Sequence, residues 1–102
     1  NRLLIIAGIR ANNTGDATPL STDFKIRTGT SATATSNTQR GNTVILGLDS
    51  DANSQTGGVI MATITSSDET FTGQVYVHVT GTNSASNAYK IAICDFVYVL
   101  GI

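Results

Sequence analysis

Residues 73–81 read GQVYVHVTG and hold the only histidine of the chain, His78. Apolar and polar residues alternate strictly through this stretch, which is the pattern of a β-strand with one buried face. The side chains that define the core side of this strand are Val75, Val77 and Val79. The side chains that point away from that core are Gln74, Tyr76, His78 and Thr80.

The same period of two runs through most of the chain, whereas no window shows the 3.6-residue apolar stripe of a helix. Strands are expected over residues 2–10, 22–28, 43–48, 59–65, 71–80 and 88–102. Residues 29–42 hold no large apolar side chain and are expected to form a long loop or a weak edge strand, and residues 49–58 a loop. The pattern predicts an all-β fold: an antiparallel β-sandwich, jelly-roll-like, with about six to eight strands and no substantial helix.

Length and charge narrow the possible functions. A chain of 102 residues supports one core, so residues 1–102 are expected to form a single domain. Charged residues make up 13% of the chain, against about 25% in soluble domains, and Thr, Ser and Asn take their place. The net charge is −1 and no basic cluster is present, so we expect no nucleic-acid partner. The longest apolar run is short and interrupted, so we expect no membrane partner either.

The first residues and the single cysteine of the chain each support one expectation. The chain opens with NRLLII, without methionine, and a predicted strand begins at once. We therefore expect a fragment or a processed part of a longer polypeptide. The single cysteine, Cys94, cannot form a disulfide within the chain.

The stretch LDSDANS places Asp49, Asp51 and Asn53 at alternate positions, as in the start of a calcium loop. The EF-hand pattern requires Gly at its sixth position and Glu at its twelfth, where this chain has Ser54 and Ile60. We therefore expect an exposed turn without a metal, in which Asp and Asn bond their own backbone. Weak Ca²⁺ binding by the two carboxylates and the amide is the alternative.

Residues for catalysis are sparse. Asp95 interrupts the apolar run IAICDFVYV, and it is expected to be a buried and satisfied carboxylate or to lie at a bulge or a subunit contact. Acid–base chemistry needs paired groups, and no partner for Asp95 is visible in the sequence. No nucleophile elbow of the form G-x-S-x-G is present. The sequence therefore predicts a protein that is not an enzyme and that has no cofactor.

The polar side of the strand in residues 73–81 has two interpretations. Gln74, Tyr76 and His78 are either an ordinary sheet surface or a polar-aromatic strip that meets a glycan or a neighbouring subunit. The strip makes a carbohydrate-binding or receptor-binding module, with a cell-surface glycan as partner, the alternative function. A chain with no Trp and three Tyr has few aromatic rings for a sugar platform.

The closing segment predicts self-association. Strict alternation places Ile91, Ile93, Val97 and Val99 on one face, and the other face holds Ala92, Cys94, Phe96, Tyr98 and Leu100. A strand of an antiparallel sandwich normally shows one face to water, so a second apolar face needs a cover. We expect a homo-oligomer whose contact includes Leu4, Ile6, Val97 and Val99. The alternative is a central strand whose second face lies under the 29–42 loop.

The opening LLIIAGIR and the following ANNTGDATPLSTDFKI resemble small β-sandwich domains of bacteriophage virion surface proteins, such as head-fibre, decoration and tail-associated proteins. The resemblance also covers the polar loops and the long apolar closing strand. It implies a non-enzymatic structural component at the virion surface or outside the cell. It further implies a homotrimer whose partners are copies of itself and other virion proteins.

Because the calcium-like loop lacks the closing bidentate carboxylate, we expect it to leave stability independent of calcium. Thermal unfolding in about 5 mM Ca²⁺, a concentration that fills weak extracellular sites, should match unfolding in chelator. A clear rise of the midpoint with calcium would contradict this expectation and would make Asp49 and Asp51 ligands.

Overall fold

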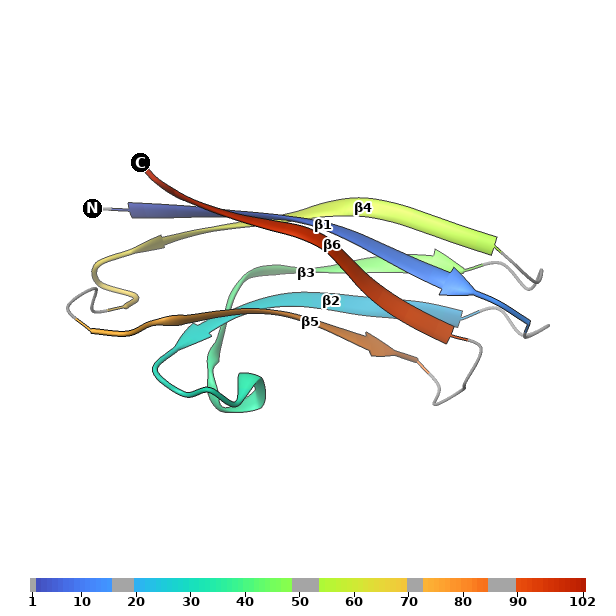
Figure 1. Ribbon diagram of the computed structural model, residues 1–102, viewed down its shortest axis with the longest axis horizontal. Helices are drawn as coiled ribbons and strands as arrows, with labels where there is room; N and C mark the ends of the chain where they lie inside the picture. The colour runs from blue at the N-terminus through green and yellow to red at the C-terminus, as the bar shows by residue number, and fades with distance from the viewer. Residues whose placement is uncertain (1, 16–19, 49–53, 70–72, 85–89) are drawn as a thin grey trace.

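A computed structural model describes residues 2–15, 20–48, 54–69, 73–84 and 90–102. The described chain forms two three-stranded antiparallel sheets, with strand orders β4-β1-β6 and β3-β2-β5 (Figure 1). The first sheet consists of β1 (Arg2–Asn13), β4 (Ser54–Thr65) and β6 (Lys90–Gly101). The second consists of β2 (Leu20–Gly29), β3 (Thr38–Leu48) and β5 (Tyr76–Asn83), and one 3-10 turn, η1 (Ala34–Ser36), precedes β3.

The all-β prediction is confirmed, while several strand boundaries differ from the expected ones. Of the 29–42 segment, expected as a loop or a weak edge strand, residues 30–37 connect β2 to β3, and the edge strand β3 begins at Thr38. β4 begins at Ser54, within the expected 49–58 loop, and β1 and β2 are also longer than expected. β5 begins at Tyr76 and ends at Asn83, so residues 73–75 of the expected 71–80 strand precede it. The extensions of β3, β4 and β5 are polar or rich in glycine, and they join the backbone ladder without an apolar alternation, so apolar periodicity does not detect them. The jelly-roll-like connectivity stays a prediction.

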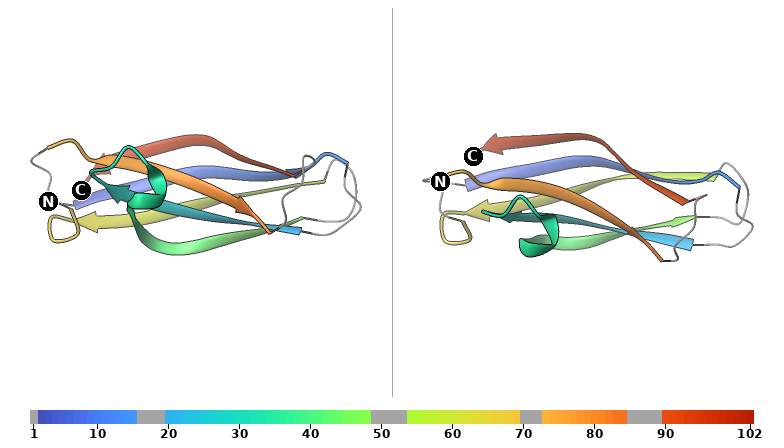
Figure 2. Two further views of the ribbon diagram at one scale, coloured as in Figure 1. Left: turned by 90° about the horizontal axis from the view of Figure 1, so that it is seen from below. Right: turned by 60° about the horizontal axis from the view of Figure 1, so that its bottom comes forward.

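The two sheets stack on each other (Figure 2), and the buried apolar side chains of both form the core between them. Both central strands direct every second residue into it, in accordance with the period of two. The buried apolar side chains of β1 are Ile5, Ala7, Ile9 and Ala11. The other sheet contributes Phe24, Ile26 and Leu46, and β4 contributes Ile60, Ala62 and Ile64. Each sheet therefore has one face in the core and one outer face.

The two long sides of the sandwich differ. At the β3–β4 side, a Cβ on Gly41 would lie 3.3 Å from the Cβ of Ala62, so the sheets close tightly there. At the β5–β6 side, a Cβ on Gly81 would lie 2.8 Å from the Cβ of Ala92. Beyond that point β6 draws away from β5 toward its C-terminal end (Figure 1). The sandwich is therefore open along the second half of β6.

A β-bulge at Asp95 overturns the expected face assignment of the closing strand. Gly8 is opposite Phe96 and Ile9 is opposite Cys94, so Asp95 is an extra residue in the ladder. Residues opposite one another share a face of the sheet. The outward set is therefore Ile91, Ile93, Phe96, Tyr98 and Leu100, and the inward set is Ala92, Cys94, Val97 and Val99. Strict alternation, which ignored the bulge, placed Ile91 and Ile93 together with Val97 and Val99.

Gly81 tests the contact between the sheets. An alanine methyl there would lie 2.8 Å from the Cβ of Ala92 and 3.0 Å from Cε1 of Phe24, so Gly81→Ala should lower the free energy of unfolding by about 1–3 kcal/mol. Gly47→Ala is the control, since a Cβ on Gly47 meets no atom within 4 Å, and it should change stability by about 0.5 kcal/mol or less. Equal urea midpoints for the two variants would contradict the contact.

Candidate assembly face

The outer surface of the β4-β1-β6 sheet is apolar over most of its length. Its side chains lie opposite one another across the three strands: Ile6 is paired with Met61 on one side and with Tyr98 on the other. We call this surface the apolar face, and it consists of Leu4, Ile6, Val59, Met61, Phe96, Tyr98 and Leu100. Met61 and Tyr98 are 58% and 60% exposed, so the face shows large apolar side chains to solvent.

Glycine flattens the middle of the apolar face. The ring of Phe96 lies over Gly8 so closely that a Cβ there would come within 2.3 Å of Cε1. The Phe96 and Tyr98 rings are 5.2 Å apart at an interplanar angle of 43°, a tilted aromatic pair. Because Gly8 has no side chain, the phenyl ring of Phe96 packs over this glycine, so β6 contacts β1 there.

β6 is exposed on its inner face as well. Val97 and Val99 point inward, yet they are 43% and 45% exposed because the sandwich is open there. β6 is a terminal strand of its sheet, and the 29–42 segment belongs to the other sheet, as the end of β2, the β2–β3 connection and the start of β3. The intramolecular alternative, a central strand covered by that segment, is therefore wrong. No described residue covers either face of the second half of β6.

The bulge residue Asp95 is held by an ion pair. The guanidinium of Arg10 donates from Nε to Oδ2 at 2.9 Å and from Nη2 to Oδ1 at 2.8 Å. These hydrogen bonds lower the pKa of the Asp95 carboxyl group, with the positive charge of Arg10 as a smaller cause. The pair fixes the bulge between β1 and β6 and leaves its two charges neutralised at the edge of the apolar face.

The outer surface of the β3-β2-β5 sheet is polar by contrast. The central strand β2 contributes Asp23, Lys25 and Arg27, which stand opposite Thr82, Thr80 and His78 of β5. Ile45, which is 62% exposed, is the one large exposed apolar side chain among the described residues of this sheet. The two outer surfaces of the sandwich therefore have opposite chemistry.

The predicted strip on β5 is partly assembled. The rings of Tyr76 and His78 stack, with centroids 5.9 Å apart and an interplanar angle of 13°. Nδ2 of Asn37 lies 3.3 Å from Nδ1 of His78 and donates to it when that nitrogen carries no proton. Gln74 precedes β5 and is exposed. His78 thus contacts the loop before β3 as well as Tyr76, and glycan binding by the strip stays a prediction.

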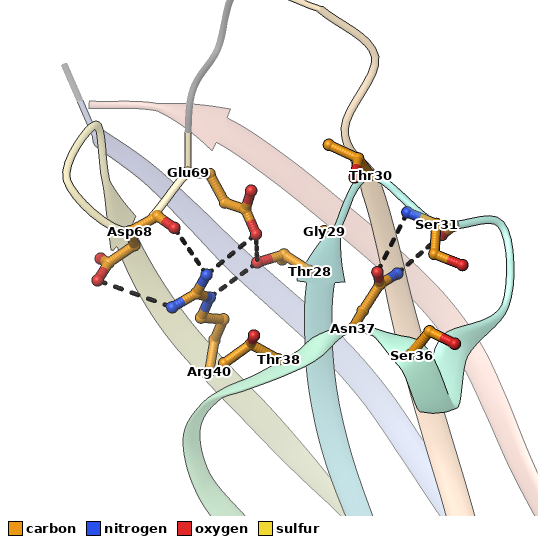
Figure 3. A pocket seen from close by; sticks show the side chains of 10 residues that line it. All are labelled: Thr28, Gly29, Thr30, Ser31, Ser36, Asn37, Thr38, Arg40, Asp68 and Glu69. Carbon is orange, nitrogen blue, oxygen red and sulfur yellow. Dashed lines mark hydrogen bonds and ion pairs between the residues drawn. The ribbon is translucent and has the colours of Figure 1, made fainter.

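Sequence reasoning missed the polar pocket around Arg40 (Figure 3). Arg40 on β3 donates to Oγ1 of Thr28 at 2.9 Å, to Oε1 of Glu69 at 3.0 Å and to the carbonyl of Asp68 at 2.8 Å. Thr28 in turn donates to Oε1 of Glu69 at 2.9 Å. The cavity measures about 320 Å³, and its other lining residues are Gly29, Thr30, Ser31, Ser36, Asn37 and Thr38. Because the charged groups bond one another, the cluster ties the turn after β4 to β2 and β3.

The residues expected as weak calcium ligands cannot be placed in this geometry. Asp49, Asp51 and Asn53 lie outside the described residues. Within the described part of the chain, no group of three or more His, Cys, Asp or Glu side chains is placed to hold a metal ion. The same residues include no helix that is long and apolar enough to cross a membrane.

Comparisons with family models, with curated proteins and with solved structures found no match for this chain. The resemblance to virion proteins therefore stays an expectation from sequence. The exposed surfaces of the sandwich are the basis for the function proposed below.

Neighbouring residues of β5 test the register of the strand. Val77 packs against the core, so Val77→Ala should lower the free energy of unfolding by about 1–3 kcal/mol. His78→Ala should lower the free energy of unfolding by about 1 kcal/mol, because it removes the hydrogen bond from Asn37. Substitution of an exposed residue without such a bond would cost about 0.5 kcal/mol. Chemical denaturation measures the free energy of unfolding of both variants. A larger loss for His78→Ala than for Val77→Ala would mean that the register of this strand is wrong by one residue.

Proposed function

We propose that this domain is a non-enzymatic structural module that assembles with copies of itself through the apolar face and the second half of β6. The observation that carries the proposal is the exposure of both faces of β6, with Val97 and Val99 on one side and Tyr98 on the other. Large contiguous apolar patches are rare on monomers and mark interaction sites. Covering both faces of one strand requires a partner that reaches around it.

Charge supports the same surface. The ion pair between Arg10 and Asp95 neutralises the charges beside the apolar face, so a partner meets little charge there. The chain as a whole has a net charge of −1, and weak repulsion permits close packing of identical subunits. The proposed contact includes Leu4, Ile6, Val97 and Val99.

The contrast between the two sheets gives the assembly an inside and an outside. With the apolar face buried between subunits, the polar β3-β2-β5 sheet, with Lys25 and Arg27, faces solvent or a further partner. We propose a virion surface role (capsid decoration, head-fibre or tail component) on the strength of the sequence resemblance. The same resemblance favours other virion proteins as partners and three subunits. The jelly-roll-like connectivity is proposed from the sequence pattern of short strands and polar loops.

Two exposed apolar residues of nearly equal exposure test the assembly. Tyr98 lies on the apolar face and is 60% exposed, and Ile45 lies on the opposite sheet and is 62% exposed. Tyr98→Lys should reduce the oligomer to monomers because it places a charge in the buried contact. Ile45→Lys should leave the mass unchanged. Light scattering coupled to size exclusion measures both masses, and thermal unfolding confirms that both variants fold.

A single monomer mass for the parent protein at high micromolar concentration would contradict self-assembly. If Ile45→Lys dissociated the oligomer and Tyr98→Lys did not, the contact between subunits would lie on the β3-β2-β5 sheet.

A further inference from the structure

The free edge of β6 is identified by the hydrogen bond at its end. Ile102 N–H donates to the carbonyl of Arg2 at 2.9 Å, so the even-numbered residues after the bulge direct their backbone groups toward β1. Successive residues of a strand direct these groups to opposite edges, so those of Val97 and Val99 point away from β1. β6 ends the strand order of its sheet, and no described strand pairs with that edge.

This edge lacks the usual protection against strand pairing. Exposed edges are commonly blocked by Pro, by Lys, by a charge or by a bulge. Residues 96–101 read FVYVLG and contain none of these. The bulge residue Asp95 lies at one end of the stretch, and its charge is paired with Arg10. The unprotected stretch is also the part of β6 that is apolar on both faces.

We propose that this edge pairs with the same edge of a second copy, antiparallel, about a two-fold axis beside Tyr98. The proposal rests on the self-assembly proposed above and adds its geometry. Identical antiparallel strands place residues at equal distance from the axis opposite one another. Tyr98 then faces the partner's Tyr98, and Val97 faces the partner's Val99. The outward N–H and C=O groups of Val97 and Val99 form the new ladder.

The register follows from the limits of the stretch. An axis beside Tyr98 aligns Phe96 with the partner's Leu100, so the full apolar length is used on both strands. Moving the axis two residues toward the N-terminus brings the bulge at Asp95 into the ladder. Moving it two residues the other way pairs Tyr98 with the partner's Ile102 and takes Phe96 and Val97 out of register with the partner's apolar stretch 96–101. The chosen register joins two sheets into one of six strands.

The pairing places new neighbours beside the side chains on both exposed faces of β6, in the plane of the extended sheet. On the apolar face, Tyr98 and Phe96 gain the partner's Tyr98 and Leu100 as neighbours. On the inner face, Val97 gains the partner's Val99 across the open side of the sandwich. An assembly built on two-fold pairs holds an even number of copies, in contrast to the trimer that the sequence resemblance favours.

Cysteine cross-linking tests the register. In a Cys94→Ala background, Tyr98→Cys places two thiols at a non-hydrogen-bonded pair, where the Cα atoms of opposed residues are about 4.5 Å apart and within disulfide reach. Mild oxidation should convert most chains to a dimer that reductant reverses. Phe96→Cys in the same background is the control, because two such residues would be about 13 Å apart along the strands. It should cross-link only when mixed with the Leu100→Cys chain.

A backbone variant provides a second readout. Val99→Pro removes the outward N–H at the free edge, a position where proline is compatible with an edge strand. It should dissociate the pair, while Val99→Ala, which keeps the N–H, should retain it. Circular dichroism of Val99→Pro should show a folded β-protein.

The outcomes separate the two proposals. An oligomer without the Tyr98→Cys cross-link, or one with an odd number of subunits, overturns the strand pairing and leaves self-assembly intact. A monomer at high micromolar concentration overturns both.

Discussion

The sheet β4-β1-β6 has two apolar faces, and the described part of the chain supplies one further sheet, which covers one of them. β1 directs Ile5, Ala7 and Ile9 into the core, where they are buried, while Leu4 and Ile6 point to the other side. Burial of apolar area is the main favourable contribution to folding. The face of β1 that packs against the second sheet therefore forms the core. The remaining face stays exposed in the monomer. Burying it requires a second molecule, and the proposed function follows from that requirement.

The bulge at Asp95 decides which side chains of β6 join each face. One extra residue moves Phe96 and Tyr98 outward and Val97 inward, which a regular strand would not do. The two hydrogen bonds from Arg10 hold the extra residue in place. The ring of Phe96 then fits over Gly8, where any side chain would displace it. An ion pair and a glycine therefore determine the aromatic part of the apolar face.

The sequence predicted the elements of this fold better than its surfaces. Alternation identified the inward residues of β1 and β5 because those strands are regular and each has one buried face. It failed for the start of β4, where Gln55, Thr56 and Gly57 pair through the backbone. It failed again for the faces of β6, because the bulge at Asp95 resets the alternation, although the charge within the apolar run had indicated a bulge as one alternative. The Arg40 cluster was beyond prediction, since it joins segments far apart in the sequence.

The edges of the two sheets explain why the proposed assembly uses β6. β4 and β3 lie side by side where the sandwich closes, near Gly41 and Ala62, so neither is open to a flat partner sheet. β5 presents Tyr76 and His78 on a polar surface, where little apolar area would be buried. Among the described strands, only β6 combines a free backbone edge with apolar side chains on both faces. Pairing there gains hydrogen bonds and apolar burial together, and each makes the other more favourable because the new ladder excludes water from the side chains beside it.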